Sequence, residues 1–133
     1  MFGVLQVLFR QALVLSTRSQ AAVETLATAR GFGRHFGLRC SEYRPLDRAP
    51  PHILIDNVLD VGEAVADDLL EIDSVKFLVL DGCDGMLTEE SVQAAVAAIF
   101  DKLEQPTVWV CTALSPHEVA ADMELDSPTI VEL

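Results

Sequence analysis

Short runs of aliphatic residues alternate along this chain with stretches in which apolar residues recur at helical spacing. Short aliphatic runs are typical of buried strands, and helical periodicity between them is typical of the segments that join parallel strands. The alternation predicts a three-layer α/β domain with helices packed on a mostly parallel sheet of about five or six strands. The expected strands are Ala12–Ser16, His35–Cys40, His52–Asp56, Lys76–Asp81, Thr107–Cys111 and Thr129–Leu133.

Capping signals indicate where helices begin between these strands. The expected helices are Arg18–Arg30, a segment after Asp60, Glu89–Glu104 and a segment opened by SPHE; their expected caps are Thr17 with Gln20, Asp60 with Glu63, Thr88, and Ser115 with Glu118. Gly31 is expected to end the first helix, because glycine readily adopts the left-handed conformation found there. The segment SEYRPLDRAPP is expected to contain no helix, because it holds three prolines.

The chain of 133 residues is long enough for one domain with a sizeable core and too short for two ordinary ones. Hydrophobic residues make up 50% of it, which excludes a disordered chain. We therefore expect a single domain over residues 1–133. Leu5, Val7 and Phe9 share one side of an extended segment within residues 1–16, which predicts an edge strand that pairs with a second copy in a homo-oligomer.

The net charge of −12 is unevenly distributed. Residues 1–50 contain seven arginines and three acids, whereas residues 51–133 contain two lysines and eighteen acids. This negative field repels phosphate backbones and anionic lipids, so we expect neither nucleic-acid nor membrane binding by residues 51–133. A protein partner with a basic surface is expected instead, and the alternative is that the acids only solvate helix faces. The expected acidic helix face comprises Glu63, Asp67, Asp68 and Glu71.

Three cysteines and three histidines lack the spacing of a disulfide framework or a zinc site. This composition fits a reducing cytoplasm, and we expect neither a metal nor a cofactor. The N-terminal segment is apolar, but it has Arg10 in its middle and is too short to cross a bilayer. A signal peptide and a membrane span are therefore not predicted.

The segment Phe77–Ser91, FLVLDGCDGMLTEES, is the stretch that most resembles an active site. A haloacid-dehalogenase phosphatase needs two aspartates two positions apart, whereas Asp81 and Asp84 are three apart. A calcium loop needs glycine where Met86 stands, and no phosphate-binding loop is present in the chain. We therefore expect no complete catalytic set here, and interpret the segment as a partner-binding or regulatory surface. Its expected residues are Asp81, Asp84, Thr88, Glu89, Glu90 and Ser91.

Three stretches, HILIDNVLDVGEAVADDLL, KFLVLDGCDGMLTEESV and CTALSPHEVAADMEL, are similar to successive parts of a STAS domain, the family of anti-sigma-factor antagonists. The resemblance covers about His35 to Leu133. It implies a non-catalytic regulatory or assembly protein that acts through protein–protein contacts, with a switch near Thr88 or Ser91. Glu89 and Glu90 already place negative charge in this turn, so we expect a surface that binds without phosphorylation.

Two other resemblances give alternatives. DSVKFLVLDGCDG followed by KLEQPTVWVCTALSP is similar to the crotonase and Clp-protease superfold, which implies an acyl-CoA enzyme or a subunit of a biosynthetic complex with its site near Gly82–Gly85. Asp56 at the end of a strand resembles the phosphoacceptor of a receiver domain, which implies a signalling role.

Overall fold

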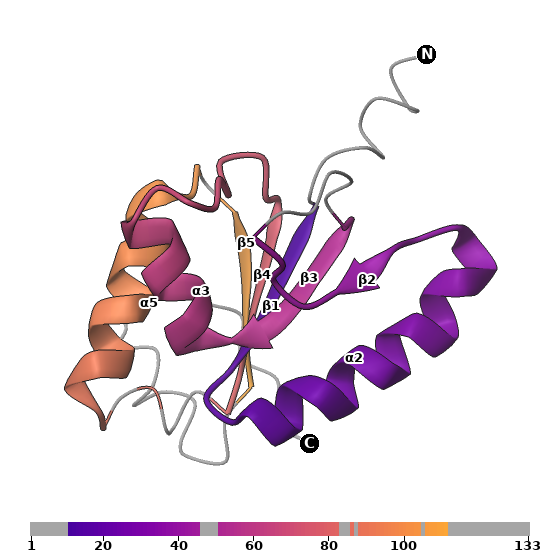
Figure 1. Cartoon of the computed structure of the whole chain (residues 1–133), viewed down its shortest axis with the longest axis horizontal. Helices are drawn as coiled ribbons and strands as arrows, with labels where there is room; N and C mark the ends of the chain where they lie inside the picture. The colour runs from indigo at the N-terminus through magenta and orange to yellow at the C-terminus, as the bar shows by residue number, and fades with distance from the viewer. Residues whose placement is uncertain (1–10, 46–50, 83–85, 87, 105, 112–133) are drawn as a thin grey trace.

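The computed structural model describes residues 11–45, 51–82, 86, 88–104 and 106–111 of the chain (Figure 1). Within these residues five strands form one parallel sheet in the order β2-β3-β1-β4-β5. The elements are β1 (Ala12–Ser16), α2 (Ser19–Gly33), the 3-10 turn η1 (Arg34–Phe36), β2 (Cys40–Ser41), β3 (Ile53–Asn57), α3 (Val58–Ala66), β4 (Phe77–Asp81), α5 (Glu90–Lys102) and β5 (Thr107–Cys111). The predicted α/β class with helices on a parallel sheet is confirmed.

Strand β1 lies in the middle of the sheet and pairs with β3 on one side and β4 on the other. Its side chains alternate between the two faces, as the pleat of a strand requires. Leu13 and Leu15 are fully buried in the larger core cluster, whereas Val14 packs against the smaller one. The central strand therefore contributes to both cores.

Helices α3 and α5 cover one face of the sheet, and α2 covers the other (Figure 1). Helices α3 and α5 approach each other closely at Gly62, where an added Cβ would lie 2.5 Å from the Cβ of Ala95. Only glycine fits this crossing without moving a helix. Nine residues from the two helices and from the strands beneath them are almost completely buried together: Leu13, Leu15, Leu54, Val58, Val61, Val65, Leu78, Leu80 and Ile99.

The expected strand His35–Cys40 is wrong. Residues Arg34–Phe36 form a 3-10 turn after α2, and Gly37 then adopts a left-handed conformation with φ 68° before β2 begins at Cys40. Phe36, one of the apolar residues that suggested a strand, is 77% exposed. Gly31 lies inside α2, which continues to Gly33, so the predicted end of this helix is also wrong.

Three predicted caps differ from the structure. Helix α2 follows Arg18 without a side-chain cap, and α5 follows Glu89, not Thr88. Helix α3 begins earlier than expected, because the side chain of Asn57 accepts a hydrogen bond from the backbone N–H of Leu59 at 2.8 Å. The expected strand Thr129–Leu133 and the helix after Ser115 lie outside the described residues.

The acidic helix face is shorter than expected, because α3 ends at Ala66. Leu69, in the turn that follows, is 68% exposed.

Among the residues described here, no helix has the length and apolar character needed to cross a bilayer.

Candidate functional site

The carboxyl ends of β1, β3 and β4 meet at one edge of the sheet. The chain leaves β1 toward β2 and β3 on one side and later places β4 on the other side, so the strand order reverses at β1. Open α/β sheets commonly bind ligands in the crevice outside such a reversal. A cavity of about 460 Å³ lies at this position. We call it the carboxyl-edge cleft, and its polar lining residues are Ser16, Thr17, Arg18, Asp81 and Glu89.

Ser16 is the most deeply buried polar residue of this cleft, at 1% exposure. It is the last residue of β1, in register with Asn57 of β3 and Asp81 of β4. Its hydroxyl oxygen has no hydrogen-bond partner among the described residues. Because an unsatisfied buried hydroxyl is costly, a ligand or water that hydrogen-bonds to it would be stabilised there.

Asn57 fixes the turn that follows β1. Its amide nitrogen donates to the hydroxyl of Ser19 at 3.3 Å and to the carbonyl of Thr17 at 3.5 Å. The carbonyl oxygen of the same side chain caps α3 through the N–H of Leu59. One side chain therefore ties the start of α3 to the β1–α2 turn and holds the hydroxyls of that turn in place.

Gly82 forms the opposite wall of the cleft, directly after β4. It has φ 71°, a conformation that residues with a Cβ rarely adopt. A Cβ placed there would lie 3.8 Å from the hydroxyl of Thr17, so the two turns face each other across the cleft.

The charges of the carboxyl-edge cleft are mixed. Arg18 is exposed at one side, Glu89 is exposed at the other, and Asp81 is half-buried between the strands. Within the part of the chain that the structure describes, no three potential metal ligands gather. The cleft therefore offers hydroxyls and one guanidinium beside two carboxylates, which suits hydrogen bonding to a polar ligand more than tight binding of a bare polyanion.

Asp56, the residue that the receiver resemblance singles out, lies beside this edge. Its two carboxylate oxygens accept hydrogen bonds from the backbone N–H groups of Tyr43 at 2.8 Å and Asn57 at 2.6 Å. These bonds connect the segment after β2 to the end of β3. Asp56 therefore has a structural role in holding the two segments together.

The predicted regulatory residues are only partly brought together. Asp81 and Glu89 both line the carboxyl-edge cleft, whereas Thr88, Glu90 and Ser91 are exposed around the start of α5. Asp84, Leu5, Val7 and Phe9 lie outside the described residues. Glu63, Asp67 and Glu71 are exposed, and the first two line a separate pocket together with Asp56 and Asp60.

Sequence reasoning missed Ser16, Thr17, Arg18 and Asn57. A signal was present, because hydroxyl and basic residues follow directly on the first expected strand. In a parallel sheet, the residues just after each strand gather at one edge. Applied to the expected strands Ala12–Ser16 and Lys76–Asp81 together, this rule places Ser16, Thr17 and Arg18 beside Asp81.

No family model matches the chain, and no curated protein matches it. Solved structures of the DEAD-box helicase Dbp5 from S. cerevisiae match its fold. Dbp5 bound to RNA and ADP BeF3 is 17% identical, with a TM-score of 0.81 over 93% of this chain and 34% of that chain. A variant of Dbp5 bound to the same ligands is 16% identical, with a TM-score of 0.83 over 96% of this chain and 35% of that chain.

A Dbp5 variant bound to Nup159, a Gle1 variant, IP6 and ADP is 15% identical, with a TM-score of 0.76 over 88% of this chain. The chain spans about a third of the length of these helicases. The similarity shows that this chain shares the α/β fold of the matched part of Dbp5. These structures lend no support to the STAS, crotonase or receiver resemblances.

Proposed function

We propose that this chain is a helicase-type RecA-like domain that acts by binding a protein partner, as a non-catalytic regulatory or assembly module. The fold likeness supports a place within a larger helicase-like assembly, because similar domains in Dbp5 occur in complexes with Gle1 and Nup159. The absence of a phosphate-binding loop from these 133 residues supports a binding role for this chain.

The observation that carries the proposal is an acidic ridge on α3 and the turn after it, formed by the exposed residues Asp60, Glu63, Asp67, Asp68 and Glu71. Lys102 pairs with Asp68 at 3.9 Å, and both side chains are mostly exposed. Such a pair contributes little. A row of exposed carboxylates favours fast, salt-dependent association with a basic protein surface.

A charge-reversal experiment tests this proposal. The variant carries Glu63→Lys, Asp67→Lys and Glu71→Lys, and a matched control carries Glu24→Lys, Asp101→Lys and Glu104→Lys. Proteins captured from the native host by the wild type and the control, but not by the ridge variant, are the expected partners. Their association rate with the purified chain should fall as salt rises. Equal capture by all three proteins, or association that salt does not change, would contradict the proposal.

A second candidate function is binding of single-stranded RNA at the carboxyl-edge cleft. The expectation that nucleic acid is not bound gains no support from the neighbours, since two of them are bound to RNA. In this chain the cleft offers the hydroxyls of Ser16 and Thr17 beside the exposed Arg18, and such groups donate hydrogen bonds to phosphate and sugar.

Fluorescence anisotropy with a labelled oligouridylate tests this candidate. Arg18→Ala should weaken binding and lower its salt dependence by about one phosphate contact. Lys102→Ala is the matched control, because it removes one positive charge on α5 away from the cleft. Binding that both variants weaken equally would indicate only non-specific attraction.

A further inference from the structure

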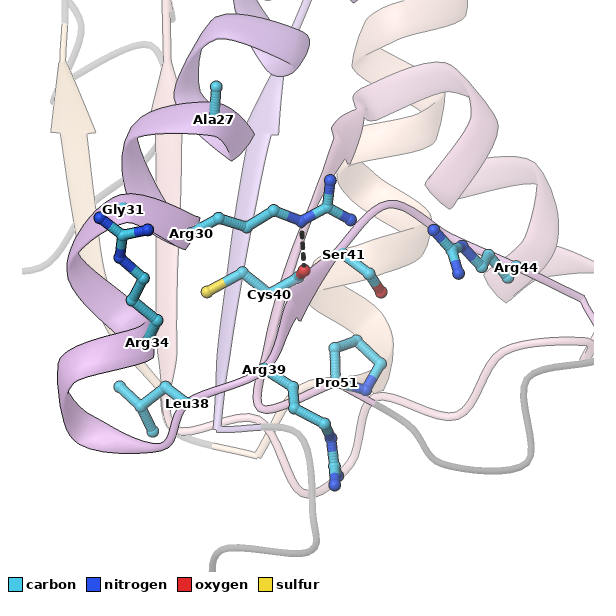
Figure 2. A pocket seen from close by; sticks show the side chains of 10 residues that line it. All are labelled: Ala27, Arg30, Gly31, Arg34, Leu38, Arg39, Cys40, Ser41, Arg44 and Pro51. Carbon is cyan, nitrogen blue, oxygen red and sulfur yellow. Dashed lines mark hydrogen bonds between the residues drawn. The ribbon is translucent and has the colours of Figure 1, made fainter.

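A second cavity lies beside the end of α2 and strand β2 (Figure 2). Its volume is about 770 Å³, which is within the range of roughly 300–1,000 Å³ typical of small-molecule sites. Four arginines line it: Arg30 from α2, Arg34 from η1, Arg39 from the segment before β2, and Arg44 from the segment after β2. We call it the arginine pocket.

Positive charge in this pocket exceeds the negative charge that the described residues place beside it. Glu42 is paired with Arg44 at 3.0 Å and with Arg30 at 3.5 Å. Arg34 has no side-chain partner among the described residues, and its side chain is exposed. Even without Arg39, the three guanidinium groups of the other pocket arginines outnumber the single carboxylate of Glu42, in a chain whose net charge is −12. Such a concentration of like charge attracts an anion.

The pocket borders the open edge of β2, but this edge is blocked. The Nε–H of Arg30 donates to the backbone carbonyl of Cys40 at 3.0 Å, as Figure 2 shows. Because this bond occupies an acceptor that an added strand would need, pairing of a peptide strand with β2 is disfavoured. Recognition in the pocket must therefore depend on the arginine side chains.

We propose that the arginine pocket binds a small molecule that carries two or more phosphate groups. Guanidinium groups donate paired hydrogen bonds that match phosphate oxygens, and several of them can contact neighbouring phosphates. None of the described residues that line the pocket is aromatic, and the larger apolar ones are Leu38 and Pro51. The described lining therefore offers no aromatic platform for a nucleobase, and the recognition that we propose is of the phosphates. None of its lining residues belongs to the acidic ridge or to the carboxyl-edge cleft.

Isothermal titration with inorganic tripolyphosphate tests the proposal on the full chain at fixed ionic strength. The pocket variant carries Arg34→Gln and Arg44→Gln, and leaves the Arg30 contact with Cys40 intact. Loss of a charged hydrogen bond weakens binding by about tenfold or more, so the double variant should lose at least that much affinity. Lys76→Gln, at an exposed residue outside the pocket, is the control and should change the affinity by less than about twofold. Equal affinity of the wild type and the pocket variant would overturn the proposal.

ATP, adenosine and a hexaglutamate peptide distinguish binding of phosphates from binding of a nucleoside or of carboxylates. ATP should bind about as well as tripolyphosphate and adenosine should not compete; tight binding of ATP with competition by adenosine would overturn it in favour of a nucleotide site. A hexaglutamate peptide that binds more tightly than tripolyphosphate would overturn the proposal in favour of an acidic protein segment.

Hydrogen exchange of the wild-type protein tests the same site without variants. Tripolyphosphate should slow exchange at the end of α2 and in β2 but not in α5, and slowing elsewhere alone would also overturn the proposal.

Discussion

The two sides of the sheet are built differently. On the α3 and α5 side, sixteen buried residues form one continuous core. On the α2 side, the smaller cluster has three buried residues, Leu26, Cys40 and Ile55, and two phenylalanines at the end of the helix remain mostly exposed. The first side therefore provides most of the hydrophobic stabilisation. The second leaves a charged cavity open to solvent.

Charge follows the same division. The charged residues of α3 and its following turn are all acidic, whereas the end of α2 and the residues around β2 are rich in arginine. Helices α2 and α3 lie on opposite faces of the sheet (Figure 1). The two surfaces approach each other after β2, where Arg44 stands between Tyr43 and Pro45, which line a pocket together with Asp60, Glu63 and Asp67. The chain's net charge hides this division.

The largest expected effect comes from truncating one core residue on each side. Ile99→Ala removes a completely buried side chain from the larger core and should lower the free energy of unfolding by about 2–5 kcal/mol. Leu26→Ala should fall at or below the lower end of that range, because Leu26 is 9% exposed in a small cluster that can relax. Urea denaturation of the two variants measures both losses, and equal losses would show that the two sides are equally packed.

Two glycines provide the next comparison, because both lie inside helices on opposite sides of the sheet. In Gly62→Ala the added Cβ would lie 2.5 Å from the Cβ and 2.8 Å from the Cα of Ala95, so α3 and α5 must separate. We expect a loss of roughly 1–3 kcal/mol in the free energy of unfolding. Gly31→Ala meets no atom within 4 Å and should gain up to about 1 kcal/mol through helix propensity. A gain for both variants would contradict the tight crossing of α3 and α5.

The bounds of β1, β4 and β5 follow the sequence prediction more closely than those of the elements at the end of α2 do. β1 and β5 have the predicted bounds and β4 differs by one residue, because these aliphatic runs coincide with buried strands. The α2 side was less predictable. The apolar residues Phe32 and Phe36 are exposed, and Gly37 reverses the chain before a strand of only two residues. An apolar run indicates a strand only when tertiary packing buries it.

For the candidate site, the sequence predicted only residues that lie in one continuous stretch. Asp81 and Glu89 were chosen from one continuous stretch, and they do line the carboxyl-edge cleft. Ser16 and Asn57 come from other strands, and their proximity depends on the strand order, which local patterns do not contain. The arginine pocket likewise joins residues from α2, η1 and both sides of β2. The seven arginines of residues 1–50 indicated positive charge there, but their number did not indicate that four of them line one cavity.

A third prediction concerns the cap that joins the two sides. Asn57→Ala removes the cap of α3 and the contacts with Ser19 and Thr17 at the start of α2, and should cost about 0.5–2 kcal/mol of unfolding free energy. Asp60→Ala, at the position predicted from sequence to be the cap, is the control and should cost less, because its side chain is exposed in the first turn. Thermal and urea unfolding compare the two, and a larger loss for Asp60→Ala would restore the predicted cap.

The smallest expected effect is a dependence of stability on pH on the arginine-rich side. A backbone hydrogen bond lowers the pKa of Glu42 below its ordinary value of 4.5, and partial burial opposes this while Arg44 and Arg30 add to it. Because the folded-state pKa is the lower one, the unfolded chain binds more protons near pH 4.5. The stabilisation is therefore present above that pH and is lost as the pH falls through the folded-state pKa.

Comparison of the wild type with Glu42→Gln isolates this contribution from that of the other carboxylates. The wild type should be the more stable protein at neutral pH, by no more than about 1 kcal/mol, because the Glu42 side chain is 43% exposed and its ion pairs are screened. The difference should shrink in about 1 M salt and disappear in acid. A difference that stays constant from neutral pH to pH 3 would show that Glu42 stabilises the α2 side through packing, and that the arginines around it are already compensated without an anion.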